Sequence, residues 1–280
     1  MKLTRDSVCV VTGAGGGIGR ALALALAREG SALALADINA EKLAGTAADA
    51  KTDGAGRVTT HAVDVADLAA MTGFRDAVKE AHGGVHLLVN NAGVALDGEL
   101  DEVSVEDMRW LFEINFWGTV YGTRLFLPLL RQQHEAQIVN IASIFGIMAV
   151  AGQTAYAASK FAVRGFSDAL RHELGGSRIT VTTVYPSGVR TDIARSARVP
   201  AKFDQTRAAA MIAGFDKLAQ TTPEQAATRI VRGVKRGEQR ILVGNGAKLM
   251  AAIAWLVPVR YWRIVDRPFA PMALRKPGGR

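Results

Sequence analysis

Two side chains that can move a proton stand four residues apart in the second half of the chain. Tyr156 and Lys160 lie in a stretch with helical spacing, so both leave the same face of the predicted helix, one turn apart. A phenol has a pKa of about 10 and is a poor base near neutral pH, but a nearby lysine cation lowers that pKa. Ser143 ends the preceding predicted strand and can offer its hydroxyl to the oxygen of a substrate. Taken alone, such a pair is more often packing and surface.

A glycine-rich turn near the start of the chain gives the pair more weight. Gly13, Gly17 and Gly19 follow a short apolar run and open a helical pattern, with the spacing GxxxGxG. Glycine permits positive φ and lets the backbone approach a pyrophosphate, which then meets the free N–H groups at the amino end of the helix. The strand before this turn and the helix after it favour a nucleotide site over a plain tight turn.

An acidic residue stands at a fitting distance from this turn. Asp37 ends the second predicted strand, 18 residues after Gly19, and its carboxylate can accept both ribose hydroxyls of an adenosine. It would repel a 2′-phosphate, and the next residues, Ile38 and Asn39, bring no positive charge to attract one. The pattern therefore favours NAD over NADP. The alternative is that Asp37 only caps the following helix.

These residues need a sheet of parallel strands with helices on both faces to hold them. Apolar runs typical of buried strands cover Val8–Thr12, Ala32–Ala36, Val58–Val63, Val85–Asn90, Gln137–Ala142, Ile179–Tyr185 and Arg240–Val243. Helical patterns cover Ile18–Arg28, Ala40–Ala50, Leu68–Ala81, Val105–Arg131, Thr154–Leu174 and Pro223–Arg236. The alternation predicts a doubly wound α/β fold, with ligand at the carboxyl ends of the strands.

Composition excludes several other classes of protein. Of 280 residues, 49% are apolar and 21% are charged, so the chain can bury a core and is not disordered. Cys9 is the single cysteine, which excludes an intrachain disulfide and a cysteine zinc cluster, and the five histidines lack metal-ligand spacing. We expect no metal, no signal peptide, no membrane span and a cytoplasmic location. We expect one domain over 1–245 with a lid at about 190–222, and an extension over 246–280.

The net charge of +8 is unevenly distributed along the chain. Residues 190–280 hold 18 basic and 6 acidic side chains. Such a basic segment serves as a solubilising face, contacts an anionic membrane surface or binds nucleic acid. Aromatic residues are not interleaved with the charges as in single-strand binders, so we expect no nucleic-acid partner. The solubilising face is the leading interpretation.

The chain resembles the short-chain dehydrogenase/reductase family from about Ser7 to about Arg195. The motifs that carry the resemblance, in order and at family spacing, are Thr12-Gly13-x3-Gly17-x-Gly19, Asp64-Val65, Asn90-Asn91-Ala92-Gly93, Asn115, Ser143, Tyr156-x3-Lys160 and Pro186–Thr191. The family implies a Rossmann-type three-layer fold with a mainly seven-stranded parallel sheet. It also implies a bound nicotinamide cofactor and reversible oxidation of a secondary alcohol to a ketone.

The resemblance assigns a role to each catalytic position. Tyr156 would be the general acid/base, and Lys160 would lower its pKa and hold the nicotinamide ribose. Ser143 would orient the substrate oxygen, and Asn115 would hold a water of the proton relay. An oxidised nicotinamide would also lower the pKa of the phenol.

The resemblance also implies a set of cofactor-binding positions. Asp64 and Val65 would meet the adenine, and Val189 and Thr191 the nicotinamide carboxamide. The full expected set is Gly13, Gly17, Ile18, Gly19, Asp37, Ile38, Asp64, Val65, Asn91, Ala92, Gly93, Tyr156, Lys160, Pro186, Gly188, Val189 and Thr191. One position departs from the family, which usually has Pro-Gly after the sixth strand. Here Ser187 follows the proline, so either the backbone is strained there or the flexible residue has moved to Gly188.

The segments that should line a substrate are mostly apolar. They are 144–148, 94–96 and 193–215, although part of them is ordinary core. We expect a hydrophobic alcohol or ketone, interconverted by an NAD-dependent oxidoreductase. The alternatives are an NADP-preferring carbonyl reductase and a non-catalytic cofactor-binding protein. The usual mark of the latter would be loss of Tyr156 or Lys160, and both are present.

The final segment lies beyond the resemblance. Residues 248–257 are apolar almost all round and must be buried somewhere. They cover the substrate pocket or a subunit interface, or they lie in a membrane interface with Trp255, Trp262 and the nearby arginines, as a peripheral contact. The family further implies a homodimer or homotetramer joined through Val105–Arg131 and Thr154–Leu174.

Overall fold

The computed structural model describes residues 1–200 and 205–264, without the side chain of Gln205. The expected lid at 190–222 therefore includes four positions, and the expected extension at 246–280 includes sixteen, that lie outside the described residues. The described strands are β1 (Val8–Thr12), β2 (Ala32–Asp37), β3 (Val58–Ala62), β4 (Leu87–Asn90), β5 (Ala136–Ile141), β6 (Ile179–Pro186) and β7 (Arg240–Val243). The described α-helices are α1 (Gly17–Arg28), α2 (Ala40–Thr52), α3 (Leu68–His82), α4 (Val105–Phe112), α5 (Gly118–Arg131), α6 (Thr154–Glu173), α7 (Gln205–Leu218), α8 (Pro223–Lys235) and α9 (Ala247–Leu256).

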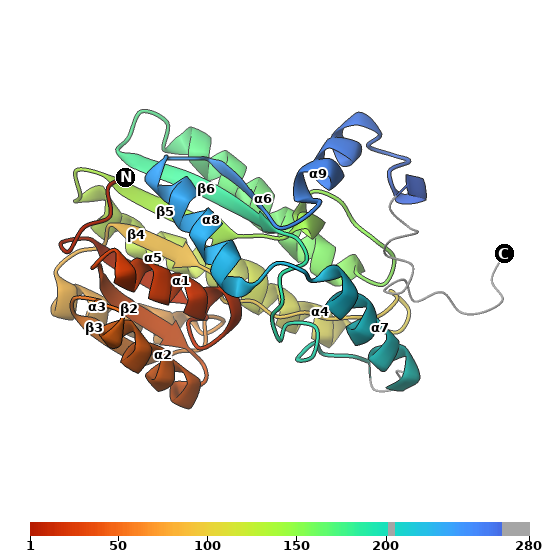
Figure 1. Ribbon diagram of the computed structural model, residues 1–280, viewed down its shortest axis with the longest axis horizontal. Helices are drawn as coiled ribbons and strands as arrows, with labels where there is room; N and C mark the ends of the chain where they lie inside the picture. Colours follow the sequence, from red (N-terminus) through yellow and green to blue (C-terminus); the bar gives the residue numbers. More distant parts are fainter. Residues whose placement is uncertain (201–204, 265–280) are drawn as a thin grey trace.

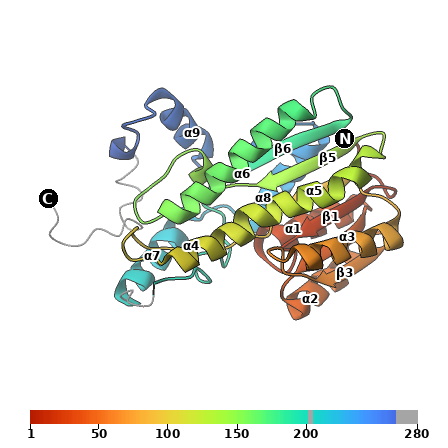
Figure 2. The same cartoon turned by 180° about the vertical axis from the view of Figure 1, so that it is seen from behind.

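The strands form one seven-stranded sheet in the order β3-β2-β1-β4-β5-β6-β7, and every adjacent pair is parallel. Helices α1, α2 and α8 cover one face (Figure 1), and α3, α5 and α6 cover the other (Figure 2). The predicted doubly wound fold of three layers is confirmed. The strand order reverses between β1 and β4, and the crevice at such a switch point is where ligands bind in these sheets.

The central strands of the sheet are buried on both faces, as the apolar runs predict. All residues of β1 and β5 are buried, and apolar clusters fill the space between the sheet and each helical layer. The sequence-predicted elements are all present, with ends that shift by a few residues. Helix α8 begins with a capping box between Thr222 and Gln225, which fixes its start.

The predicted helix over Val105–Arg131 contains a π turn that the sequence did not reveal. Residues Glu113–Trp117 form a wide π-helical turn between α4 and α5, with no break in the chain's helical course. Such turns inside helices are frequent at functional sites, because they displace one side chain from the regular pattern. Here the displaced region holds Asn115, which is buried.

The segments around the carboxyl ends of the strands form a further layer. Figure 1 shows α4, α7 and α9 gathered beyond those ends. Helix α7 lies within the expected lid, and an ion pair between Arg207 and Glu102 ties it to the segment before α4, with Nη1 and Oε1 2.8 Å apart. Helix α9 is the predicted apolar helix of the final segment. Over the described ranges, 1–200 and 205–264, we find no helix with the length and apolarity of a membrane span.

Candidate functional site

The glycine-rich turn is built so that only glycine fits at its key positions. Gly13 and Gly17 adopt φ of +64° and +51°, where side chains are strained. A Cβ on Gly13 would lie 2.8 Å from the Cα of Ala92, and a Cβ on Gly19 would collide with the carbonyl oxygen of Gly13. The turn between β1 and α1 therefore packs closely both on its own helix and on the chain after β4.

Asn91 and Thr12 hold this turn in place. The side-chain amide of Asn91 donates to the carbonyl oxygens of Thr12 and Gly13, at 3.0 and 3.1 Å. The hydroxyl of Thr12 in turn accepts the backbone N–H groups of Asn91 and Ala92, at 3.0 and 3.1 Å. The side chain of Asn91, expected to line the cofactor, is thus bonded within the protein and shapes the turn.

The amino end of α1 retains donors for an anion. Its N-cap is Gly16, which has no side chain to cap the first turn, and a Cβ on Gly16 would meet open space. The first backbone N–H groups of a helix lack intrahelical partners, and they bind phosphate well. The geometry of the turn and the helix end fits a pyrophosphate.

Asp37 is fixed at the end of β2 by two backbone groups. Its Oδ2 accepts the N–H of Gly15 at 2.8 Å, and its Oδ1 accepts the N–H of Asn39 at 2.9 Å. Helix α2 is capped by Asn39, whose side chain accepts the N–H of Lys42 at 2.9 Å. The capping alternative for Asp37 is therefore wrong, and its carboxylate faces the glycine-rich turn.

The remaining expected cofactor positions lie along the same edge of the sheet. Ile38 is 73% exposed beside Asp37, and Asp64 is exposed after β3, where it accepts the N–H of Ala66. The side chain of Val65 is buried against Gly118. Gly93 is exposed after β4. Ile18 is half-buried in the first turn of α1, Pro186 ends β6, and Val189 pairs with Thr221 in an isolated β-bridge.

After β6, the glycine that the family usually has directly behind the proline stands one residue further along the chain, at Gly188. Gly188 has φ of +55°, whereas no non-glycine residue in 1–200 or 205–264 has positive φ, so Ser187 is not strained. A Cβ on Gly188 would lie 2.5 Å from the carbonyl oxygen of Leu218. The last residue of the motif, Thr191, faces the glycine-rich turn, because a Cβ on Gly17 would lie 3.1 Å from its Cγ2. The flexible position has moved to Gly188.

The four expected catalytic residues gather where β5, α6 and the π turn meet. The side chains of Tyr156 and Ser143 lie close together, since the serine hydroxyl acts on the pKa of the phenol. The Nζ of Lys160 lies 5.7 Å from the centre of the Tyr156 ring and donates to the carbonyl oxygen of Ile141 at 3.2 Å. A Cβ on Gly93 would lie 3.2 Å from that Nζ, so the exposed Gly93 leaves room beside the lysine.

Asn115 is bonded to the chain that follows Gly93. Its side-chain oxygen accepts the N–H of Val94 at 2.8 Å, and its amide donates to the Val94 carbonyl at 3.0 Å and to Ser159 Oγ at 3.1 Å. Asn115 therefore links the π turn, the chain after β4 and helix α6. These contacts occupy its side chain, so a water held by Asn115 stays a prediction.

Burial is the largest cause of the shifted pKa values of Tyr156 and Lys160. It raises the pKa of Tyr156 to about 12; the hydrogen bond from Ser143 acts to lower it, and the charge of Asp97 to raise it. Burial also lowers the pKa of Lys160 to about 8. The sequence predicts a Tyr156 pKa lowered by Lys160. In the structure, desolvation outweighs any such effect, so without a cationic ligand Tyr156 is a protonated phenol.

The sequence analysis did not identify two polar residues that lie near Tyr156. Asp97 and Gln153 are buried, and the side-chain amide of Gln153 donates to Oδ1 of Asp97. Burial raises the pKa of Asp97 to about 6. The available signal was a single acidic residue, Asp97, directly after the apolar residues 94–96 and four positions beyond Gly93. An otherwise apolar region thus contains one polar pair.

The apolar segments expected to line a substrate do come together around Tyr156. One cluster joins Leu96, Ile144, Phe145 and Met148 to the tyrosine, and Ile193 packs against it. The final segment joins the same cluster through Ala254 of α9 and through partly buried neighbours. Tyr261, beyond α9, exchanges hydrogen bonds with the backbone of Ala149 at 2.8 and 3.2 Å. The described part of that segment covers the region beside Tyr156.

Comparison with known proteins agrees with this geometry. The family model for short chain dehydrogenases matches residues 7–202. The chain belongs to the short-chain dehydrogenase/reductase family. Its site is accordingly that of an oxidoreductase of this family, with the expected motifs assembled at one edge of the sheet.

Individual family members are similar over almost the whole chain. The protein named "Putative oxidoreductase SadH" of Mycobacterium tuberculosis is 44% identical over 268 residues, which cover 95% of this chain and 96% of that protein. A crystal structure of a short-chain dehydrogenase/reductase from Burkholderia phymatum in complex with NAD is 31% identical with a TM-score of 0.83, covering 100% of this chain and 99% of that one. An alcohol dehydrogenase from Thermococcus sibiricus, complexed with 5-hydroxy-NADP, is 25% identical with a TM-score of 0.72, covering 85% of this chain and 95% of that one.

Proposed function

We propose that this family member is an NAD-dependent oxidoreductase that interconverts a hydrophobic secondary alcohol and its ketone, with Tyr156 as general acid/base. The observation that carries the proposal is the position of Lys160, whose Nζ lies 5.7 Å from the centre of the Tyr156 ring, with Ser143 close enough to act on the pKa of the phenol. These groups lie at the same sheet edge as the glycine-rich turn and Asp37. A reacting carbon placed between them would meet both a proton donor and a cofactor.

The residues present fit NAD. The pyrophosphate would meet the turn at Gly13–Gly17 and the uncapped N–H groups of α1, and the adenosine ribose would meet the carboxylate of Asp37. A 2′-phosphate there would face that negative charge, with Ile38 and Asn39 beside it in place of an arginine or a lysine. The NAD complex of the Burkholderia phymatum relative supports this choice. Because the Thermococcus sibiricus protein is complexed with 5-hydroxy-NADP, the NADP-preferring alternative is tested as well.

When bound, NAD supplies the nicotinamide carbon that exchanges a hydride with the substrate carbon. Ser143 Oγ and Tyr156 Oη orient the substrate oxygen between them. In oxidation, the phenolate form of Tyr156, which the positive charge of an oxidised nicotinamide would favour, takes the hydroxyl proton; in reduction, the protonated phenol gives the proton to the substrate oxygen. The Lys160 ammonium favours the phenolate form and, beside the exposed Gly93, can hold a ribose hydroxyl. The cluster around Tyr156 excludes water from these groups.

The surroundings of Tyr156 support a hydrophobic substrate. Leu96, Phe145 and Met148 present apolar surface there, and the Asp97–Gln153 pair is the polar exception. Helix α7 and its flanking residues, at 190–200 and 205–222, would act as the lid, and residues 1–245 would form one catalytic domain. Non-catalytic cofactor binding is the alternative from another class.

Titration with NAD and with NADP, followed by NADH formation from a panel of hydrophobic secondary alcohols, tests the proposal. We expect tighter binding of NAD and turnover with part of the panel. Tighter binding of NADP would contradict the role of Asp37. Binding of NAD without turnover on any alcohol or ketone of the panel would favour the non-catalytic alternative.

Assembly and location are further parts of the proposal. We propose a homodimer or homotetramer joined through residues 105–131 and 154–174, because Trp117 of the π turn and Phe161 of α6 are 41% and 39% exposed. A cytoplasmic location is supported by the buried, reduced Cys9. A peripheral membrane contact of the final segment is supported by the exposed Trp255, Leu256 and Trp262. Light scattering of the Trp117→Lys, Phe161→Lys variant tests the assembly, and an unchanged mass would contradict this interface.

A further inference from the structure

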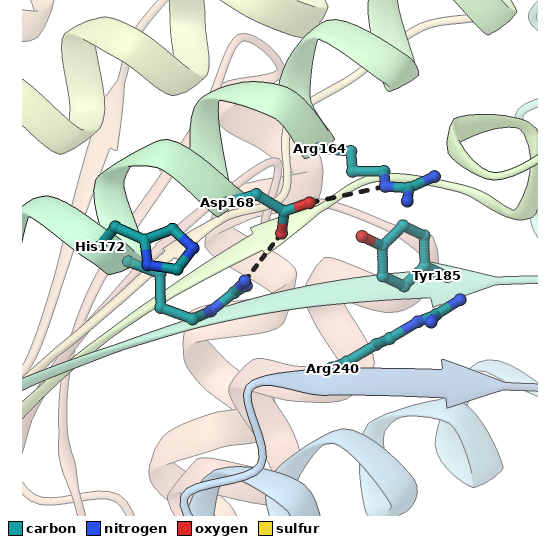
Figure 3. Close-up of a pocket in the computed structure, with 6 residues that line it drawn as sticks. Arg164, Asp168, His172, Tyr185 and Arg240 are labelled. Atoms are coloured by element: carbon teal, nitrogen blue, oxygen red, sulfur yellow. Dashed lines mark hydrogen bonds and ion pairs between the residues drawn. The ribbon is translucent and has the colours of Figure 1, made fainter. Parts of the chain in front are cut away.

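A hollow lies outside the proposed catalytic site, on the face of the sheet that α6 covers. It has a volume of about 340 Å³ and is bounded by α6, the end of β6 and the start of β7 (Figure 3). Its lining residues are Arg164, Asp168, Arg171, His172, Tyr185 and Arg240. The four residues from α6 fall on one face of the helix, since they are spaced by four, seven and eight positions. Three guanidinium groups thus share the hollow with one carboxylate.

The negative charge of Asp168 is already balanced by Arg171, one of the three arginines. Arg171 Nη1 donates to Asp168 Oδ1 at 2.7 Å. Its other nitrogens donate to the carbonyl oxygens of Val181 and Gln239 and to Thr183 Oγ1, at 3.1 to 3.2 Å. Arg171 is therefore a fixed part of the wall, and its charge is balanced by Asp168.

The other two arginines leave positive charge in the hollow. Arg164 makes only long contacts, with Nε 3.6 Å from Asp168 Oδ2 and Nη1 3.4 Å from the carbonyl oxygen of Gly146. The guanidinium carbon of Arg240 lies 5.5 Å from the centre of the Tyr185 ring, and no described carboxylate forms an ion pair with it. Figure 3 shows the two guanidinium groups on opposite sides of that ring.

Tyr185 is a neutral part of the wall between these charges. Its side chain is 2% exposed, and burial raises its pKa, so the hydroxyl keeps its proton. Guanidinium groups bind phosphate and carboxylate oxygens through paired N–H donors, and two neighbouring cations gain when an anion lies between them. The volume lies at the lower end of the range for small-molecule pockets.

We propose that this hollow binds a phosphate-type oxyanion, held by the guanidinium groups of Arg164 and Arg240. The group can come from a small phosphate ester or from a lipid headgroup. A neighbouring hollow of about 430 Å³ shares Arg240 and is lined in addition by Arg229, Lys248, Leu242, Ala251, Ala252 and Trp255. Its apolar residues would contact a chain attached to the phosphate.

Calorimetric titration with inorganic phosphate tests the site, with NAD present at saturation to occupy the glycine-rich turn. We expect saturable binding that weakens about tenfold in Arg240→Gln and in Arg164→Gln, because each loses a charge-assisted hydrogen bond. Arg232→Gln is the matched control, because Arg232 is exposed on α8 and does not line the hollow. Its phosphate affinity should be unchanged. Two independent variants keep the test valid if one of them fails to fold.

Two further ligands distinguish the sources of the oxyanion. Glycerol phosphate represents a small ester, and phosphatidylglycerol vesicles represent a lipid headgroup. Binding of the ester that depends on Arg240 assigns the site to a small molecule, and vesicle binding alone with the same dependence assigns it to a lipid. Absence of saturable binding to all three probes, or equal binding by Arg240→Gln and Arg232→Gln, would overturn the proposal. Phosphate affinity is also measured without NAD, so a failure of NAD binding is seen separately.

Discussion

Asp37 Oδ2 accepts the backbone N–H of Gly15 at 2.8 Å, so the acidic residue at the end of β2 is fixed to the glycine-rich turn after β1. A Cβ on Gly15 would lie 2.9 Å from the same oxygen, which shows how closely the two segments approach. The group that is proposed to select the cofactor therefore also shapes the turn that binds its phosphates.

Replacing Asp37 separates these two roles. We expect Asp37→Ala with Ile38→Arg to weaken NAD binding by about tenfold or more and to tighten NADP binding, because the repulsion of a 2′-phosphate becomes an attraction. Ile38 is 73% exposed, so the arginine fits without repacking. Asp37→Asn is the control that removes charge but keeps an acceptor for Gly15. If the double variant still binds NAD tenfold more tightly than NADP, Asp37 does not set the preference.

The buried pair of Asp97 and Gln153 makes a prediction about stability against pH. The folded-state pKa of Asp97 is raised to about 6 from an ordinary value of 3.8, so the folded state binds the proton more tightly than the unfolded state. Stability is therefore lost as pH rises from about 4 to about 6, by up to about 3 kcal/mol. Asp97→Asn should remove that loss and be more stable than the natural protein at pH 7.5, but not at pH 4.

Urea unfolding at the two pH values measures this effect. Asp101→Asn is the matched control, because Asp101 is an exposed acid a few residues along the same segment. Asp101→Asn should have nearly the same free energy of unfolding as the natural protein at either pH. An Asp97→Asn variant that loses stability equally at pH 4 and pH 7.5 would show that the carboxylate is ionised and stabilising in the folded protein.

The sheet and its helices were predictable because the signals are local. Strands covered on both faces are continuous apolar runs, and helices carry amphipathic spacing, so even the ends of β1 and β7 agree with the prediction. The π turn at Glu113–Trp117 escaped because its apolar spacing continues that of the helices beside it. The Asp97–Gln153 contact joins residues 56 positions apart, and the pKa of Tyr156 depends on its burial. Neither property can be found before the fold is known.

Gly188 allows a test of the shifted motif after β6. Gly188→Ala should destabilise the protein by about 2 kcal/mol or more, because φ is +55° and the new Cβ would lie 2.5 Å from the Leu218 carbonyl oxygen. Gly45→Ala, in the middle of α2 with open space around its Cβ, should instead stabilise by about 0.5–1 kcal/mol. Thermal unfolding compares them. Equal effects at the two positions would contradict the strained geometry at Gly188.

The exposed aromatic residues of the final segment predict weak, salt-sensitive membrane binding. Trp255 is 79% exposed and Leu256 68%, and both should enter the headgroup region of an anionic bilayer. We expect co-flotation with anionic vesicles that falls when both residues are changed to glutamate. Leu100→Glu, at an exposed leucine before α4, is the control. If the natural protein does not co-float with the vesicles, the membrane contact is wrong, and Trp255 and Leu256 would contact a protein instead.

The most direct test of the proposed chemistry is the Tyr156→Phe variant, assayed for NAD binding and for turnover of a hydrophobic secondary alcohol. The phenylalanine keeps the ring in its apolar cluster but removes the hydroxyl that is proposed to carry the proton. We expect NAD to bind with nearly unchanged affinity and turnover to fall by about a hundredfold or more. Turnover at a rate close to that of the natural enzyme would contradict Tyr156 as the general acid/base.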